Sequence, residues 1–320
     1  MAEGDAAREA VADAARRTTS RRDLSRDEHF ADVSPELGVI DDAAFDQLLD
    51  VEPDAAMALL ADMTTATDRT LRELAARLAG RIVVEAARDA AASRRGVDRL
   101  VRRPLTSSDG ELDLDASLEA IHRARTTGTP LDADELVVQS WNRAETSICL
   151  LVDRSGSMHG ERLATAAIAA AAVVLRAPLD CSVVAFAEDA VVVKGQHEPR
   201  SAEQVVDDLF QLRGFGVTDV GLALRVAREQ LERSRAARRV TVLLSDCRPT
   251  AGGSPEPDAA VLDELVLLAP EDDHADAGAL AAALGLRWYP LGGPSSVATA
   301  LRSALSRTET AAGESVRPTD

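Results

Sequence analysis

Cysteine is scarce in this chain of 320 residues, which contains three. Cys149, Cys181 and Cys247 are odd in number, lie far apart and stand in apolar runs. The sequence therefore predicts neither a disulfide framework nor a zinc site. Reduced thiols suit a reducing compartment, so we expect a cytoplasmic protein.

Long apolar runs are also missing. The N-terminal stretch MAEGDAAREAVADAARR carries acidic residues and has no apolar segment of the signal-peptide type. Nowhere do about 18 uncharged apolar residues follow one another, the length that a membrane-spanning helix needs. The longest candidate, residues 163–175, is rich in alanine and too short. We expect no membrane partner.

Positive charge is in short supply as well. The 36 basic residues face 54 acidic ones, which gives a formal net charge of −18, and Lys194 is the sole lysine. A chain this acidic is repelled by phosphate backbones, so we expect no nucleic-acid partner. The glycine-rich phosphate loops G-x-G-x-x-G and G-x-x-x-x-G-K-S/T are absent too. Any ATP hydrolysis linked to this chain is therefore expected to take place on a partner.

The composition that remains is that of a folded protein, with 46% hydrophobic and 28% charged residues. Apolar residues recur at spacings of three and four through Leu71, Leu74, Leu78 and Ile82, which predicts helices. Gly128 and Pro130 interrupt the chain where a linker is expected. The predicted organisation is a mobile tail over 1–30, a helical region over 31–127, a linker over 128–144, an α/β domain over 145–308 and a second tail over 309–320.

Strand-like and helix-like segments alternate after the linker. The continuous apolar run at 146–152 predicts a buried strand, and residues 162–176 predict a helix with a buried face. The alternation continues to a last helix near 296–305. Parallel strands need crossover connections that pack on the sheet, so this pattern predicts an α/β fold. We expect a doubly wound, mostly parallel sheet, Rossmann-like in type, preceded by an all-helical N-terminal region.

Oxygen-bearing side chains follow several of these strands, at the edge where ligands bind in such folds. Asp153, Ser155 and Ser157 follow the first strand, Thr218 precedes a helix, and Asp246 follows the strand at 240–244. Two carboxylates and three hydroxyls, with no His or Cys, form a hard ligand set that suits Mg²⁺, with Mn²⁺ as a substitute. Such an ion attracts a further anionic oxygen, so the five residues predict a metal-dependent docking point for a partner's Asp or Glu.

The series Asp153-x-Ser155-x-Ser157, then Thr218, then Asp246 resembles the metal-ion-dependent adhesion site of von Willebrand factor type A (vWA) domains. The resemblance covers about residues 145–308. It implies that the three hydroxyls contact the metal directly and that the two aspartates act mostly through water. The segments DRSGSM and LLSD are similar to those of bacterial CoxE-like proteins and magnesium-chelatase D subunits, which work beside MoxR-type AAA+ ATPases.

Two positions depart from the family pattern. Val217 and Cys247 stand where the family often has glycine, before the threonine and after the last aspartate. A side chain at such a position restricts the conformations that a loop can adopt.

These features favour a non-enzymatic, Mg²⁺-dependent protein-binding module, an adaptor that works with a MoxR-type AAA+ ATPase in the maturation or remodelling of a client protein. One alternative is a metal-dependent hydrolase or phosphotransferase. An aspartate-based phosphotransferase needs a second carboxylate two residues after its nucleophile, and Ser155 stands there instead. The other alternative is a structural scaffold with a vestigial metal site.

Overall fold

The computed structural model describes residues 1–15, 18–91, 99–105, 111–128, 130–142, 146–154, 160–212, 217–248 and 250–306. The chain forms two compact units. The first comprises Met1–Ser93, Thr146–Arg235 and Arg239–Asp320, and the second comprises Arg94–Glu145 and Ala236–Arg238. No helix among the described residues is both long enough and apolar enough to span a membrane.

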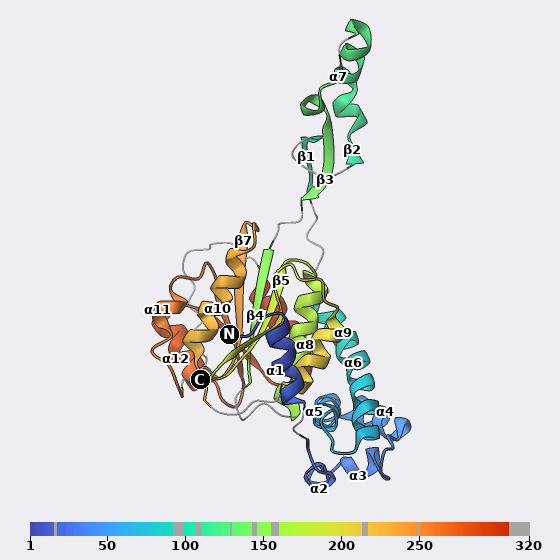
Figure 1. The fold of residues 1–320 in the computed structure, drawn as a ribbon, viewed down its shortest axis with the longest axis vertical. Helices are drawn as coiled ribbons and strands as arrows, with labels where there is room; N and C mark the ends of the chain where they lie inside the picture. The colour runs from blue at the N-terminus through green and yellow to red at the C-terminus, as the bar shows by residue number, and fades with distance from the viewer. Residues whose placement is uncertain are drawn as a thin grey trace, which may run out of the picture. The chain divides into compact units, whose positions relative to one another are not determined.

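A six-stranded sheet with the order β6-β5-β4-β7-β8-β9 forms the centre of the first unit (Figure 1). The pairs β4–β5, β7–β8 and β8–β9 are parallel, and β6 pairs antiparallel with β5 at one edge. This confirms the predicted mostly parallel sheet. The strands are β4 (Thr146–Asp153), β5 (Cys181–Phe186), β6 (Ala190–Lys194), β7 (Arg238–Leu244), β8 (Leu265–Pro270) and β9 (Arg287–Leu291).

Both faces of this sheet are covered, which explains why its strands are continuous apolar runs. Successive side chains of a strand point to opposite faces. In β4, Ile148, Leu150 and Val152 belong to one hydrophobic cluster, whereas Cys149 and Leu151 belong to the other. Burial on both sides removes the polar alternation of a half-exposed strand.

Helices from the C-terminal half of the chain supply the two covers. The first cluster packs α8, α9 and α13 against the sheet, and the second packs α10 and α12 against the opposite face. The bounds are α8 (Gly160–Arg176), α9 (Ala202–Gln211), α10 (Val220–Glu232), α11 (Glu256–Ala259), α12 (Ala275–Leu284), the 3₁₀ turn η3 (Pro294–Ser296) and α13 (Val297–Leu305).

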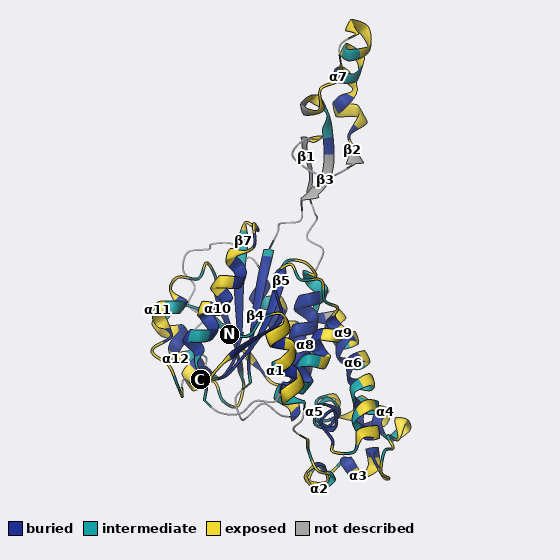
Figure 2. Cartoon of the chain, in the orientation of Figure 1, coloured by how far each residue is buried: buried dark blue, intermediate teal, exposed yellow. Residues whose placement is uncertain are grey.

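The N-terminal helices form a further layer over α8. Both α5 and α6 pack on α8, so that 13 of its 17 residues are buried (Figure 2). A helix enclosed on two sides is apolar around most of its circumference, as the Ala-rich sequence of α8 is. The helical character predicted from residue 31 onward is confirmed by α4 (Asp42–Val51), α5 (Pro53–Met63) and α6 (Arg69–Ala91). The short helix α2 (Arg21–Leu24) lies inside the span expected to be a mobile tail, and α3 (Phe30–Val33) begins at the last residue of that span.

The first residues of the chain lie on the edge of the sheet, which differs from the mobile tail expected over 1–30. Ala2 forms a parallel bridge with Val191 of β6, and the helix α1 (Asp5–Ala14) buries Ala7 and Val11. Glu3 forms an ion pair with Arg233. The low apolar content of this segment suggested disorder. Backbone pairing with the open edge of β6 orders it instead, and composition does not reveal such pairing.

The second unit contains a small antiparallel sheet with the order β1-β3-β2. Its elements are β1 (Arg99–Pro104), β2 (Glu111–Leu112), α7 (Leu114–Thr127), the 3₁₀ turn η2 (Ala133–Glu135) and β3 (Val137–Asn142). Sequence analysis assigned this span to the helical region and the linker, so the three strands correct those boundaries. The sequence RLVRRP of β1 has no regular apolar alternation, and its pairing partner lies more than thirty residues away along the chain.

Candidate functional site

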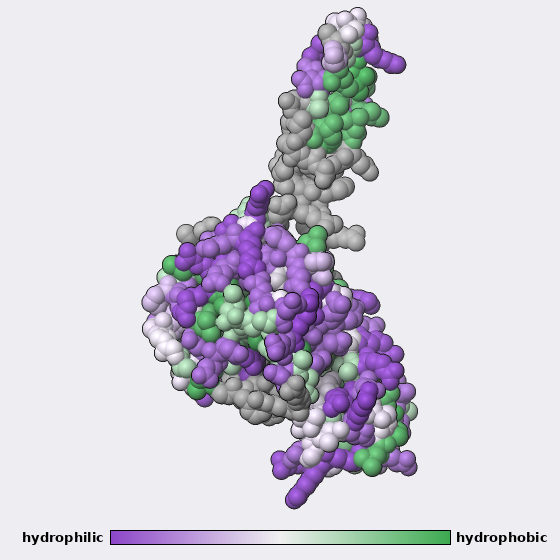
Figure 3. All heavy atoms as spheres, viewed as in Figure 1, coloured by the Kyte–Doolittle hydropathy of each residue, from purple (hydrophilic) through white to green (hydrophobic). Residues whose placement is uncertain are grey.

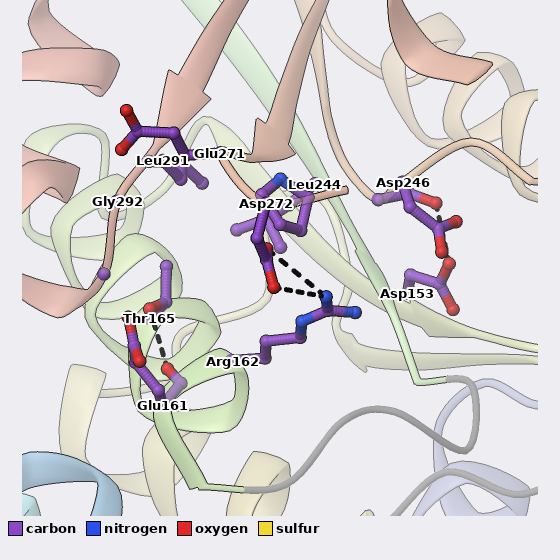
Figure 4. Close-up of a pocket in the computed structure, with 13 residues that line it drawn as sticks. Asp153, Glu161, Arg162, Thr165, Leu244, Asp246, Glu271, Asp272, Leu291 and Gly292 are labelled. Atoms are coloured by element: carbon purple, nitrogen blue, oxygen red, sulfur yellow. Dashed lines mark hydrogen bonds and ion pairs between the residues drawn. The ribbon is translucent and has the colours of Figure 1, made fainter. Parts of the chain in front are cut away.

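Two strands that are neighbours in the sheet, β4 and β7, end at the candidate site. β4 ends at Asp153, whose residue is only 3% exposed, and β7 is followed by Ser245 and Asp246. Both aspartates line one cavity and lie on the same side of it (Figure 4). The structure thus brings together two of the five residues predicted to bind metal. Ser155 and Ser157 lie outside the described residues.

Ser245 connects the two strand ends. Its hydroxyl donates a hydrogen bond of 2.7 Å to Oδ2 of Asp153 and accepts one of 2.9 Å from the backbone N–H of Cys247. A carboxylate that is buried and bonded in this way has a fixed orientation. Sequence analysis did not select Ser245, although a hydroxyl directly after a strand and next to Asp246 was a usable signal.

Thr218 is held against the loop that follows Asp246. Its N–H donates to Oγ1 of Thr250 over 2.7 Å, and its carbonyl accepts from the N–H groups of Thr250 and Ala251 over 3.2 Å each. These bonds use the backbone of Thr218 and not its hydroxyl. The next residue, Asp219, donates its N–H to the carbonyl of Ala187 just beyond β5. The turn that carries Thr218 is therefore attached both to the loop that follows β7 and to the residue that follows β5.

Cys247 has a φ of 59°, in the left-handed region that favours glycine. This is one of the two positions where the family pattern often has glycine, and the observed backbone gives the physical reason for that preference. The side chain is buried, and burial together with the nearby Asp246 and Asp153 raises the pKa of its thiol to about 12. Cys247 is thus a neutral packing residue and not a thiolate ligand. Val217, at the other position, is half-buried.

The arginines around the aspartates already have acidic partners. Arg248 contacts Asp273 at 2.9 Å and Asp276 at 3.1 Å. Arg162 lies 3.4 Å from Asp272 and 3.9 Å from Asp273. These ion pairs neutralise the charge of Arg248 and Arg162 beside the site.

The donor set fits a hard divalent ion. In the part of the chain that the structure describes, no three His, Cys, Asp or Glu side chains gather in a metal-binding arrangement. The predicted set does not need such a group, because it contains two carboxylates and is completed by hydroxyls. Carboxylate and hydroxyl oxygens are the ligands of Mg²⁺ or Mn²⁺, and zinc favours nitrogen and sulfur.

Comparison with known proteins finds that the segment carrying the site is similar to vWA domains. Residues 148–249 match the family model of the von Willebrand factor type A domain. A von Willebrand factor type A structure from Catenulispora acidiphila is 19% identical with a TM-score of 0.41, covering 52% of this chain and 43% of that one. No curated protein matches the chain.

Two further structures are similar to about half of this chain. An aerotolerance-related membrane protein from Bacteroides fragilis is 15% identical with a TM-score of 0.38, covering 50% of this chain and 98% of that one. The manganese-loaded TRAP protein of Plasmodium vivax is 15% identical with a TM-score of 0.41, covering 51% and 74%. The matched family span, 148–249, contains all five residues of the candidate site.

Proposed function

We propose that the vWA domain of this chain is a protein-docking module that requires a divalent metal, with Mg²⁺ as the physiological ion. The observation that carries this proposal is the meeting of Asp153 and Asp246 at the carboxyl ends of adjacent strands, with the Thr218 turn fixed to the loop that follows Asp246. Ser155, Ser157 and Thr218 would supply the neutral oxygens.

The bound ion would act as an electrostatic switch for docking. Two carboxylates neutralise its charge and the other ligands are uncharged, so an anionic oxygen from a partner is a favourable additional ligand. Without the ion, an approaching Asp or Glu meets the like charges of Asp153 and Asp246 and is repelled. The partner therefore carries an exposed carboxylate.

The role we assign is non-enzymatic. The resemblance of DRSGSM and LLSD to CoxE-like proteins and magnesium-chelatase D subunits supports an adaptor role beside a MoxR-type AAA+ ATPase, in the cytoplasm. In such a pair the ATPase hydrolyses ATP, and this chain selects the client through the metal site.

The test combines metal binding with partner capture. Isothermal titration with Mg²⁺ is run on the wild type, Asp153→Ala and the double variant Ser155→Ala/Ser157→Ala. Asp263→Ala, an exposed aspartate two residues before β8 at the opposite end of the sheet, is the matched control. Capture from the native lysate with Mg²⁺ or EDTA follows. We expect the site variants to lose both the metal and a specific partner, and the control to keep them.

Two outcomes would contradict the proposal. If a specific partner is retained equally well in EDTA and by the site variants, the metal site does not bind it, and the N-terminal helices become the better candidate for the binding surface. Absence of metal binding by the wild type would make the site vestigial and the domain a structural scaffold.

A further inference from the structure

A cavity of about 430 Å³ extends away from the aspartate pair, along the carboxyl ends of β7, β8 and β9. Leu244, Pro270 and Leu291 give it apolar walls, and Thr165 of α8 faces it as well. Asp153 and Asp246 line one side, Glu161 and Glu271 lie on the other, and Arg162 lies between them (Figure 4). The cavity is therefore continuous with the metal site but lies largely outside it.

The far side of this cavity is acidic. Arg162 is already paired with Asp272 and Asp273. Neither Glu161 nor Glu271 has a side-chain ion pair within the described residues. The charge that remains uncompensated on this side is negative.

Two consecutive glycines leave room for these carboxylates. A Cβ on Gly292 would lie 2.7 Å from Oε2 of Glu271. A Cβ on Gly293 would lie 2.6 Å from Oε1 of Glu161 and 2.7 Å from Oδ2 of Asp54 in α5. Carboxylate oxygens from α5 and α8 thus converge on one point. Burial and the nearby Asp54 and Asp272 raise the pKa of Glu161, as expected where negative charge is crowded.

We propose that this cavity receives a Lys or Arg side chain of the same partner segment whose carboxylate docks at the metal. The apolar walls accommodate the aliphatic stem, and Glu161 and Glu271 receive the cationic group. The inference rests on the proposed function, because the metal site fixes the segment beside the cavity. The partner is then recognised by an acidic and a basic residue close together in one segment. Figure 3 shows that the visible face of the first unit is largely hydrophilic.

The test uses a phage-displayed library of short random peptides, selected on the full chain in Mg²⁺ and eluted with EDTA. We expect enrichment of peptides that contain Asp or Glu together with Lys or Arg. Selection on Glu161→Gln/Glu271→Gln is expected to keep the acidic residue and lose the basic one. Glu229→Gln, an exposed residue of α10, is the matched control and is expected to behave as the wild type. Thermal midpoints confirm that each variant folds.

An enriched peptide is then resynthesised with norleucine in place of lysine, which keeps the stem and removes the charge. Its affinity for the wild type is expected to fall about tenfold or more, the effect of losing one charge-assisted hydrogen bond. Its affinity for the double variant is expected to change less than about twofold.

The outcomes separate the two hypotheses. Acidic peptides that depend on Asp153 but show no preference for a basic residue would overturn this inference and leave the proposed function standing. The same basic residue selected by the wild type and by the double variant would also overturn it. A library that gives no Mg²⁺-dependent peptide would count against both.

Discussion

The hydroxyl of Ser245 donates a hydrogen bond of 2.7 Å to Oδ2 of Asp153, a residue 92 positions away in the chain, and so joins the end of β4 to the residue that follows β7. The same oxygen accepts the N–H of Cys247. One serine therefore orients the buried carboxylate and fixes the loop that carries Asp246. The positions of the Asp153 and Asp246 carboxylates are therefore set by the sheet to which both loops are attached.

Ser245→Ala is expected to lower the free energy of unfolding by about 1–3 kcal/mol, because a buried carboxylate loses a donor. It should also weaken Mg²⁺ binding, since Asp153 is then less well oriented. Urea denaturation in EDTA measures the first effect and calorimetry the second. Ser254→Ala, at an exposed position, is the control. Unchanged stability and affinity would show that the hydrogen bond does not organise the site.

Divalent metal is expected to stabilise the fold, because an ion that binds the native loops and not the unfolded chain adds stability by mass action. At 100 times its dissociation constant the gain is about 2.7 kcal/mol. Thermal melts in Mg²⁺, Mn²⁺ and EDTA measure it, and Asp153→Ala should remove the metal response. Identical midpoints at saturating metal would contradict the prediction.

Cys247→Gly is expected to be more stable than Cys247→Ala by about 1–2 kcal/mol, the cost of placing a Cβ in a left-handed backbone. Both variants lose the buried sulfur, so the sulfur does not contribute to their difference. Chemical denaturation of the two variants is the measurement. Equal stabilities would mean that the loop relaxes out of this conformation.

Asp62→Ala is expected to loosen the first turn of α8 at a cost of about 1 kcal/mol, typical of a lost helix cap. Oδ1 of Asp62 in α5 accepts the N–H of Gly160, the first residue of α8, over 3.1 Å. Because α8 begins directly after the segment that contains Ser155 and Ser157, we also expect weaker Mg²⁺ binding in calorimetry. Asp46→Ala, exposed on α4, is the control. Wild-type affinity in Asp62→Ala would show that the helical layer does not support the metal site.

In EDTA, Glu161→Gln is expected to have a larger free energy of unfolding than the wild type at high pH, and the same free energy of unfolding at low pH. The folded-state pKa of Glu161 is raised, mainly by burial, so its contribution to stability is lost as pH rises from the ordinary glutamate value through the raised one. The gain of the variant should therefore be absent at lower pH and appear above that window. Glu203→Gln gives the opposite sign, because hydrogen bonds from its own N–H and from Ser201 lower the pKa of Glu203. Urea denaturation across pH measures both, and a gain independent of pH would contradict the assignment.

The sequence by itself determined the α/β half of this protein. A strand that is buried on both faces is a continuous apolar run, and such a run can be recognised without knowing which segments pack against it. The strand at 146–152 became β4 with one further residue, and the helix predicted at 162–176 became α8, beginning two residues earlier. Oxygen-bearing residues directly after such runs could be read as one site, since the carboxyl ends of parallel strands share an edge.

Tertiary structure alone decided what depends on contacts between distant segments. Ala2 on the edge of β6, Asp62 at the start of α8, and Asp54 beside Gly293 are pairings across many residues, and no local pattern encodes them. The strands of the second unit were missed for the same reason, since β1 is recognisable only through its pairing with β3. Local periodicity specifies which face of an element is buried, whereas only the packed chain specifies what buries it.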